Sequence, residues 1–314
     1  MSFLYFLESI RTPVGDFLMS GITRFGEEAL FIVLALLFLW CIDKKEGYYL
    51  LAVGFCGLLF NQFLKIFCRV PRPWVKDPSF IPVEGSTTAA TGYSFPSGHT
   101  QTAVGSYGAV ARWHKKAWLR GVAVALCLLV PFSRMYLGVH TPLDVGVSIL
   151  FALLLIFALY PLFKTLDAHP YRLFYLLGGL LVLSVLFVVY MECASFPEDV
   201  DAHNLDSALK NAYTLLGSLL GFCLIYFLDV RVYRYETKAP LLAQALKLIL
   251  GAVIVVAIKS LLKSPLNALF SDHHVADAIR YFLLFAIAGG LWPLTFPYFT
   301  RFADFVNRKR KKQS

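Results

Sequence analysis

The residues best placed to do chemistry in this chain are a histidine and an aspartate four positions apart, His140 and Asp144. Thr141 and Pro142 between them indicate the start of a helix, so the carboxylate would lie one turn from the imidazole ring. A carboxylate in that position fixes the tautomer of a histidine and raises the basicity of its other ring nitrogen. We therefore predict that His140 can act as a nucleophile that Asp144 orients.

A second histidine, His99, follows Pro96-Ser97-Gly98 and opens a segment rich in Gly, Ala, Ser and Thr. A helix N-terminus that begins with Ser and Gly offers unpaired N–H groups, the positive end of the helix dipole and close approach of the backbone to a ligand. Together these properties predict an anion site at Ser97 and Gly98. A plain N-cap at Ser97 is the alternative that the sequence leaves open.

Three basic residues accompany the two histidines, namely Lys65, Arg72 and Arg134. A single basic residue at the end of an apolar helix can simply extend its charge to the lipid headgroups, and for Lys65 alone that explanation comes first. Independent snorkelling does not explain why the basic residues, both histidines and Asp144 would all arrive at one face of the membrane. The joint placement favours a site.

The elements that must position these residues are membrane-spanning helices. Apolar residues make up 58% of the 314 residues and charged residues 16%, against about 25% charged residues in a typical soluble domain. This composition excludes an ordinary soluble globule and a disordered chain. Runs of roughly 20 apolar residues predict nine spans, because a bilayer core needs about that length of helix. The predicted spans cover residues 26–42, 47–68, 98–113, 117–133, 142–163, 171–190, 212–230, 239–262 and 278–298.

The predicted fold is an all-α polytopic membrane bundle with about nine transmembrane helices and an N-terminal interfacial helix. The interfacial helix is expected at residues 3–18, where apolar side chains recur at helical spacing with charged residues between them. We divide the chain into this N-terminal region at 1–25, a core with the candidate residues at 26–163, and further transmembrane helices with a basic tail at 164–314.

The distribution of basic residues predicts the orientation in the membrane. If nine spans alternate, most of the 29 Lys and Arg residues fall on one side, which is then cytoplasmic by the positive-inside rule. The candidate residues fall on the other side. The net charge of +9 is therefore a topology signal, and we expect membrane lipids rather than nucleic acid as the partner of this charge.

The candidate residues form three blocks: Lys65 to Arg72-Pro73, Pro96 to His99, and Ser133-Arg134 to His140 and Asp144. In order and internal spacing these blocks resemble the three signature blocks of the type 2 phosphatidic acid phosphatase family. That family includes undecaprenyl pyrophosphate phosphatases and glucose-6-phosphatases, and it shares its phosphate pocket with vanadium haloperoxidases. The resemblance covers roughly residues 29–163, and the chain from Tyr171 onward matches no motif.

The resemblance implies a role for each residue. Lys65, Arg72 and Arg134 would hold the phosphoryl oxygens, with hydrogen bonds added by Ser97 and the Gly98 backbone. It implies that His140 attacks phosphorus to give a phosphohistidine while Asp144 holds its tautomer, and that His99 protonates the leaving oxygen and then activates water. No metal and no other cofactor is expected.

Several other features invite a functional interpretation, and for each we favour a structural one. The six cysteines lie mostly in apolar runs, without the paired spacing of disulfides or zinc sites. We expect a plain loop at His273-His274, although Asp272 and Asp277 flank it, and helix packing within the chain at Gly217 and Gly221. We expect a basic tail at residues 309–314 that ends at the cytoplasmic interface. We also expect a solvated acidic loop, which comprises Glu192, Glu198, Asp199, Asp201, His203 and Asp206.

We expect a metal-independent phosphatase of the acid phosphatase type that hydrolyses a phosphoric monoester or diphosphate on the extracytoplasmic face. A polyprenyl diphosphate, phosphatidic acid or phosphatidylglycerol phosphate would suit a pocket at the membrane boundary. The alternatives are a sugar phosphatase like glucose-6-phosphatase, a phospholipid or phosphate transporter without turnover, and a haloperoxidase. The expected location is a bacterial plasma membrane, or the endoplasmic reticulum if the source is eukaryotic. The oligomeric state is left open.

Overall fold

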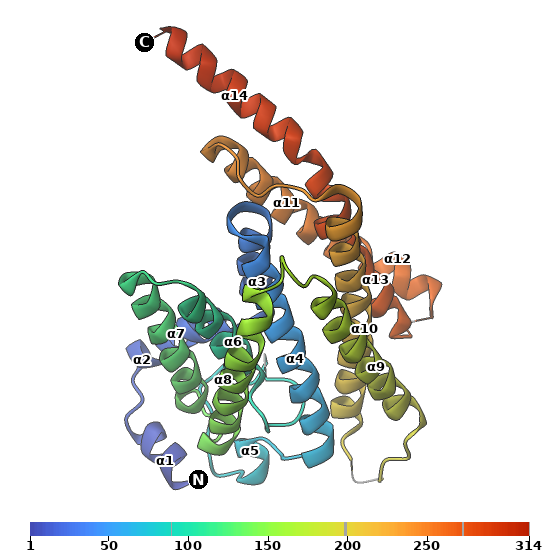
Figure 1. Cartoon of the computed structure of the whole chain (residues 1–314). Helices are drawn as coiled ribbons and strands as arrows, with labels where there is room; N and C mark the ends of the chain where they lie inside the picture. Colours follow the sequence, from blue (N-terminus) through green and yellow to red (C-terminus); the bar gives the residue numbers. More distant parts are fainter. Residues whose placement is uncertain (89, 198–199, 272, 314) are drawn as a thin grey trace. The chain divides into compact units, whose positions relative to one another are not determined.

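The computed structural model describes residues 1–88, 90–197, 200–271 and 273–313, and its regular elements within these ranges are all helical. Several residues of the sequence predictions, Glu198, Asp199, Asp272 and Ser314, lie outside the described residues, as do the side chains of 310–313. The α-helices are α1 Ser2–Ser9, α2 Pro13–Thr23, α3 Glu28–Leu37, α4 Lys44–Cys68, α5 Pro73–Lys76, α6 Gly98–Trp113, α7 Ala117–Tyr136, α8 Pro142–Lys164, α9 Tyr171–Cys193, α10 Ala202–Leu228, α11 Leu241–Leu261, α12 Lys263–Leu269, α13 Val275–Phe285 and α14 Phe296–Gln313 (Figure 1).

The chain is an integral membrane protein built as an all-α polytopic bundle, as the sequence predicted. Seven helical segments within the described ranges are long and apolar enough to cross a bilayer, and an eighth is added if one bent pair forms a single span. The seven segments are Lys44–Lys76, Ala117–Tyr136, Pro142–Lys164, Tyr171–Cys193, Ala202–Tyr233, Leu241–Leu269 and Val275–Lys309. The predicted number of nine spans is not confirmed.

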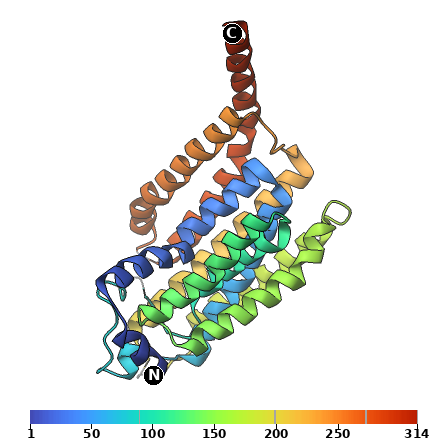
Figure 2. The ribbon, with the colours of Figure 1, turned by 90° about the vertical axis from the view of Figure 1, so that its left-hand side faces the viewer.

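Two of the nine predicted spans account for the difference. The predicted span at 26–42 is helical only as α3 and a π-helical turn at Phe38–Ile42, and it reaches spanning length only when joined to Pro13–Gly26 across a bend of 51°. Helix α6 has the predicted bounds of 98–113, but with 16 residues, many of them small or polar, it is not among the candidate spans. Its small and polar residues are instead largely buried, and it lies beside α7, which runs in the opposite direction (Figure 1 and Figure 2).

The predicted interfacial helix at residues 3–18 is two helices, α1 and α2, because the chain breaks before Pro13. Thr12 is the N-cap of α2, where its hydroxyl accepts a hydrogen bond from the Gly15 amide at 3.1 Å, and Pro13 takes the first helical position. Arg11, at the break, donates from Nε to the Tyr136 carbonyl oxygen at 3.0 Å. The two helices therefore dock on the end of α7, while several of their apolar side chains remain exposed.

Contacts along the chain define two compact units. Unit 1 comprises residues 1–32, 49–163 and 191–211, and unit 2 comprises residues 33–48, 164–190 and 212–314. In unit 1 the long segment between α5 and α6 lies at the same end as α1 and the loop from α7 to α8 (Figure 1). The Val83 amide, in that segment, donates to the Leu137 carbonyl oxygen at 3.1 Å. All three candidate blocks belong to this unit.

Unit 2 is held by close helix packing and by buried polar contacts. Asp229 accepts hydrogen bonds from the Lys44 ammonium at 2.7 Å and from the Tyr48 hydroxyl at 2.9 Å. A Cβ atom at Gly217 would lie 1.9 Å from the Ala278 carbonyl oxygen, and one at Gly221 would lie 2.3 Å from Phe285 Cβ. The two glycines thus let α10 approach α13 closely, which confirms the prediction of helix packing within the chain.

This packing predicts the effect of adding one methyl group. Gly217→Ala should destabilise the protein by about 1–3 kcal/mol, because the new Cβ meets backbone that cannot move out of the way without separating the helices. Thermal unfolding in detergent measures the change. Gly178→Ala in α9 is the matched control, since nothing lies within 4 Å of a Cβ there. Equal unfolding temperatures for the two variants would contradict the close packing.

Candidate active site

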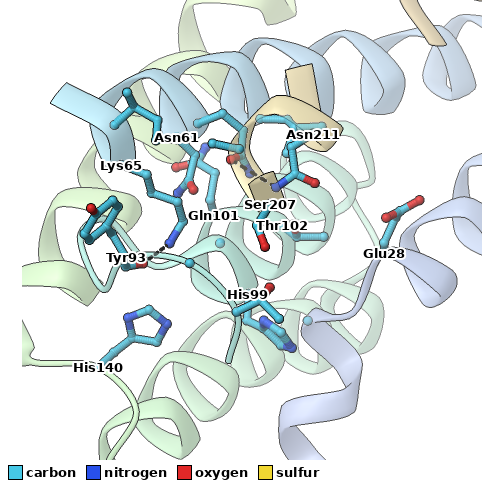
Figure 3. A pocket seen from close by; sticks show the side chains of 18 of the residues that line it. Glu28, Asn61, Lys65, Tyr93, His99, Gln101, Thr102, His140, Ser207 and Asn211 are labelled. Carbon is cyan, nitrogen blue, oxygen red and sulfur yellow. Dashed lines mark hydrogen bonds between the residues drawn. The ribbon is translucent and has the colours of Figure 1, made fainter. Parts of the chain in front are cut away.

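The candidate residues surround a cavity of about 260 Å³ in unit 1, and one face of α4 forms a wall of it (Figure 3). Gly54, Leu58, Asn61 and Lys65 recur at intervals of four, three and four residues, so they share that face of the helix. The remaining wall comes from Gly26 and Glu28 around the start of α3, from α6, from the end of α7 and the start of α10, and from the segments around α5 and after α7.

Lys65 and Arg72 are buried, and backbone carbonyls hold both. The Lys65 ammonium donates a hydrogen bond to the Tyr93 carbonyl oxygen (Figure 3). Arg72 lies at the N-cap of α5, and its guanidinium donates to the carbonyl oxygens of Thr91, Gly92 and Val139 at 2.8–3.0 Å. Three carbonyls from two loops thus fix the orientation of Arg72 at the cavity wall.

Arg134 brings a third buried positive charge to the same cavity. It lies in the last turn of α7 and donates from Nη1 to the Thr23 hydroxyl of α2 at 2.8 Å. Within the described ranges neither Arg134 nor Lys65 nor Arg72 forms an ion pair with a carboxylate, so their charge is not neutralised locally. This excess of positive charge favours an anion in the cavity.

His140 lies beside these cations, in the loop between α7 and α8. Its side chain is 2% exposed, and its Nε2 atom is 3.0 Å from Arg72 Nη1. Burial first, and then repulsion from Arg72, Arg134 and Lys65, lowers the pKa of His140 well below its ordinary value of 6.5. The ring is therefore neutral at neutral pH, with a lone pair available on one nitrogen.

Asp144 lies behind His140 in the first turn of α8, at ion-pair distance from the ring. Its Oδ2 atom is 3.5 Å from His140 Nδ1, and it accepts hydrogen bonds from the Thr141 amide at 2.7 Å and the Ser94 hydroxyl at 2.6 Å. A carboxylate on that side favours the tautomer with the proton on Nδ1, which leaves the lone pair on Nε2. We predicted that Asp144 would make His140 more basic, but burial among three cations has the larger effect and lowers its pKa.

The start of α6 contributes Gly98 and His99 to the cavity lining, but not Ser97. Ser97 is fully buried as the N-cap, and its hydroxyl accepts a hydrogen bond from the Thr100 amide at 3.4 Å. Its amide donates to the Asp144 carbonyl oxygen at 3.2 Å. In this structure the Ser97 hydroxyl acts as the plain N-cap that the sequence left open. Gly98 faces open space, because a Cβ there would have only Asn61 Oδ1 as a neighbour, at 3.8 Å.

The structure thus brings six of the predicted residues to one cavity and places Asp144 and Ser97 directly behind its wall. Sequence reasoning missed several polar residues of the lining, of which Glu28 is the acidic one, on the opposite side from Lys65 in Figure 3. The missed residues are Glu28, Asn61, Gln62, Gln101, Thr102, Asn204, Ser207 and Asn211. Polar residues within an apolar span, such as Asn61 and Gln62 one turn before Lys65, were the available signal.

Helix α10 contributes to the site although it lies far beyond the third block in sequence. Asn204, Ser207 and Asn211 line the cavity, and Asn211 donates from its amide to Gln62 Oε1 at 3.2 Å. A second cavity, of about 640 Å³, shares Arg72 and residues 91–93 with the first as part of its wall. No cluster of three or more His, Cys, Asp or Glu side chains suited to a metal ion occurs among the described residues.

Comparison with known protein families gives two matches. The PAP2 superfamily matches residues 45–167, and the family described as PAP2 superfamily phosphatase, transmembrane extension, matches residues 213–302. The second match covers much of the region that the sequence motifs left unassigned. No solved structure matches the chain.

Individual proteins of known function resemble the chain at 25–30% sequence identity. Sphingosine-1-phosphate phosphatase 1 of Rattus norvegicus is 25% identical over 261 residues, which cover 77% of this chain and 58% of that protein. Phosphatidylglycerophosphatase B of Bacillus subtilis (strain 168) is 30% identical over 162 residues, which cover 47% of this chain and 75% of that protein. Undecaprenyl-diphosphatase BcrC of the same strain is 29% identical over 150 residues, which cover 47% of this chain and 74% of that protein. The chain thus spans little more than half the length of the first relative.

The excess positive charge predicts that inorganic phosphate binds in the cavity and stabilises the protein. Phosphate should raise the unfolding temperature of the native protein, because a ligand that binds only the folded state shifts the equilibrium towards it. Lys65→Met should abolish this shift. Without phosphate, the variant should unfold at the same or a higher temperature than the native protein, since it removes one of three buried like charges.

Thermal unfolding across a phosphate titration measures both effects. Lys76→Met is the matched control, because Lys76 is exposed on α5 and outside the cavity, so its variant should keep the full response to phosphate. An undiminished phosphate response in Lys65→Met would exclude the cavity as the anion site.

Proposed function

The chain belongs to the PAP2 superfamily, and from this premise we propose that it is an integral-membrane phosphatase that hydrolyses a lipid phosphate or diphosphate ester. One observation carries the proposal, namely that the neutral His140 points Nε2 towards Arg72 at 3.0 Å, in a cavity that Lys65 and Arg134 also line. A nucleophile among three unpaired cations suits attack on an anionic phosphoryl group, because the cations stabilise the charge of its transition state.

In the first step we propose that His140 Nε2 attacks phosphorus in line with the ester oxygen. The P–N bond forms as the P–O bond to the lipid breaks, and the leaving oxygen takes a proton from the protonated form of His99. Burial and the three cations lower the pKa of His99 to about 3 in the free protein, so the negative charge of the bound phosphoryl group has to raise it before this step. The lipid departs as an alcohol, or as a monophosphate if the substrate is a diphosphate. The phosphoryl group is then carried on His140, with the Nδ1 proton facing Asp144.

In the second step a water molecule attacks phosphorus and transfers a proton to His99, which lost its proton in the first step. The P–N bond breaks, inorganic phosphate is released, and His140 regains its lone pair. His99 suits both steps because it lines the same cavity as His140 at the N-terminus of α6 (Figure 3). General acid–base exchange of this kind contributes about 10²–10⁴-fold to a rate.

Arg72 must change partner when the substrate binds. Its Nη1 atom lies 3.0 Å from the His140 lone pair that would make the attack, so this contact has to break first. A phosphoryl oxygen between the two residues would accept the Arg72 hydrogen bond and free the imidazole. The contacts of Nε and Nη2 with Gly92 and Thr91 would keep the guanidinium in place during the exchange.

The names of the relatives support a lipid rather than a soluble substrate. They refer to sphingosine 1-phosphate, undecaprenyl diphosphate and phosphatidylglycerophosphate, each a phosphate attached to a long apolar group. For this chain we propose the same class of substrate, with the headgroup in the cavity and the tail in the bilayer. The charge distribution of the sequence supports an extracytoplasmic site, because the more basic loops fall on the other side.

Substitution of the nucleophile should abolish turnover. We expect His140→Ala to lower kcat for phosphate release from phosphatidic acid in detergent by at least about 10³-fold, because the covalent step is lost. His169→Ala is the control, since His169 lies in the loop after α8 and does not line the cavity. Full activity of the His140→Ala protein would exclude His140 as the nucleophile. If the native protein bound the lipids but released no phosphate, the result would favour a transporter.

We also expect the activity to be independent of divalent cations. In the proposed mechanism Lys65, Arg72 and Arg134 supply the positive charge that a metal ion provides in other phosphatases. Phosphate release should therefore change by less than about twofold after dialysis against EDTA and on adding Mg²⁺ back. Loss of activity in EDTA with recovery in Mg²⁺ would contradict the mechanism.

A further inference from the structure

Uncharged amides and hydroxyls line another part of the cavity, where Glu28 is the one acidic residue among the described residues of the lining (Figure 3). We refer to this part of the lining as the amide subsite, and it consists of Asn61, Gln62, Gln101, Thr102, Ser207 and Asn211. The proposed mechanism uses none of these residues. They come from α4, α6 and α10, so three helices converge on a surface without catalytic groups.

Gln101 is the central residue of the amide subsite. It lies one turn into α6 and is 5% exposed, yet neither its Nε2 nor its Oε1 has a hydrogen-bond partner within the described part of the chain. A Cβ atom at Gly57 of α4 would lie 2.6 Å from Gln101 Nε2, so the glycine makes room for this amide. Burial of an unpaired amide is unfavourable, and a ligand that hydrogen-bonds to it would remove this cost.

Asn61 connects the amide subsite to the phosphate end of the cavity. It is 1% exposed, and its Nδ2 donates to the Pro96 carbonyl oxygen at 3.4 Å, while its Oδ1 has no partner among the described residues. A Cβ at Gly98 would lie 3.8 Å from this Oδ1. Asn61 Oδ1, an unpaired acceptor, therefore lies next to the N-terminus of α6, where we place the phosphoryl group. Gln101 lies three residues after Gly98 on the same helix α6.

The chemistry of the amide subsite selects its ligand. Hydrocarbon in this space would leave the amides of Asn61 and Gln101 buried and unpaired. A second phosphate would gain more from the cations of the cavity lining than from neutral amides. A hydroxyl or an amine matches the donors and acceptors present, because each of these groups can donate to Asn61 Oδ1 or Gln101 Oε1, and a hydroxyl can also accept from Gln101 Nε2.

We therefore propose that the preferred substrate is a lipid phosphate monoester with a hydroxyl or amino group on the carbon next to the one that carries the phosphate, and that Asn61 and Gln101 recognise this group. The inference rests on the proposed function and narrows its substrate class. It ranks such monoesters above polyprenyl diphosphates, which present no polar group beyond their phosphates. Asn61 and Gln101 are then specificity residues that contact the substrate away from the reacting atoms.

The test compares two substrates that differ by one hydroxyl. The first is a 1-acylglycerol 3-phosphate, and the second is its 2-deoxy analogue, an acyl propanediol phosphate with the same chain. The native protein should have a kcat/KM about tenfold higher for the hydroxylated lipid, because a buried site that hydrogen-bonds a hydroxyl discriminates against an analogue without it. Gln101→Met should remove this preference and leave the deoxy substrate within about twofold of its native value.

The variant is suited to the purpose because Met has a length similar to Gln and no protein hydrogen bond to Gln101 is lost. Asn61→Leu gives a second, independent measurement of the same loss of preference. Equal kcat/KM for both lipids in the native protein, or an equal loss for both in Gln101→Met, would overturn the amide subsite while phosphate release itself still supported the proposed function. A polyprenyl diphosphate serves as a third substrate. If Gln101→Met lowered kcat/KM for the diphosphate alone, the subsite would hold a second phosphate instead, which would also overturn the proposal. Release of phosphate from none of the lipids would instead count against the proposed function.

Discussion

The site depends on keeping three positive charges buried together without a carboxylate to neutralise them. Lys65, Arg72 and Arg134 repel one another in a medium that screens charge poorly, so the free protein would gain stability by losing one of them. The protein offsets part of this cost with neutral oxygens. Tyr93, Thr91, Gly92 and Val139 contribute backbone carbonyls, and Thr23 contributes its hydroxyl. Carbonyl dipoles hold the side chains without cancelling their charge, and an incoming anion is then the strongest partner available.

This constraint explains the irregular structure around the site. Carbonyl oxygens within a helix are already paired, so the oxygens that hold Lys65 and Arg72 must come from loops. The segment from 91 to 93 and the turn at Val139 provide them. Asp144 joins the same two segments, because it accepts hydrogen bonds from Ser94 and Thr141 and lies against His140. The one carboxylate in this group therefore lies against His140 and, within the part of the chain that the structure describes, forms no ion pair with the three cations.

Glycine residues allow close approach of helices within each of the two units. Gly57 lets the Gln101 side chain lie against α4, and Gly217 lets α10 approach α13 in the other unit. Helices in a bilayer gain little from burying apolar surface against each other, so close packing of this kind contributes much of their association. Gly98 has the opposite role, because a Cβ there would meet the cavity rather than protein.

The sequence by itself determined the class of fold and identified six residues that line one cavity. Its composition requires a helical membrane protein, because only helices or closed barrels satisfy the backbone in lipid, and its long apolar runs have the length of spanning helices. The four-residue spacing of His140 and Asp144 predicted that the carboxylate lies close to the imidazole ring. The break at Thr12-Pro13 was also readable as a cap followed by proline, although we predicted one continuous helix there.

Only the tertiary structure decided what lies opposite these residues. The small residues of α6 are typical of a helix that packs against other helices rather than lipid, but only the structure shows that α7 lies beside it. The carbonyls that hold Arg72 leave no trace in the identities of residues 91, 92 and 139, because every residue carries a carbonyl. The effect of burial on His140 exceeded that of its neighbouring carboxylate, which local spacing does not predict. The amide subsite needs α10 beside α4 and α6, and a contact across 149 positions between Gln62 and Asn211 is a property of packing.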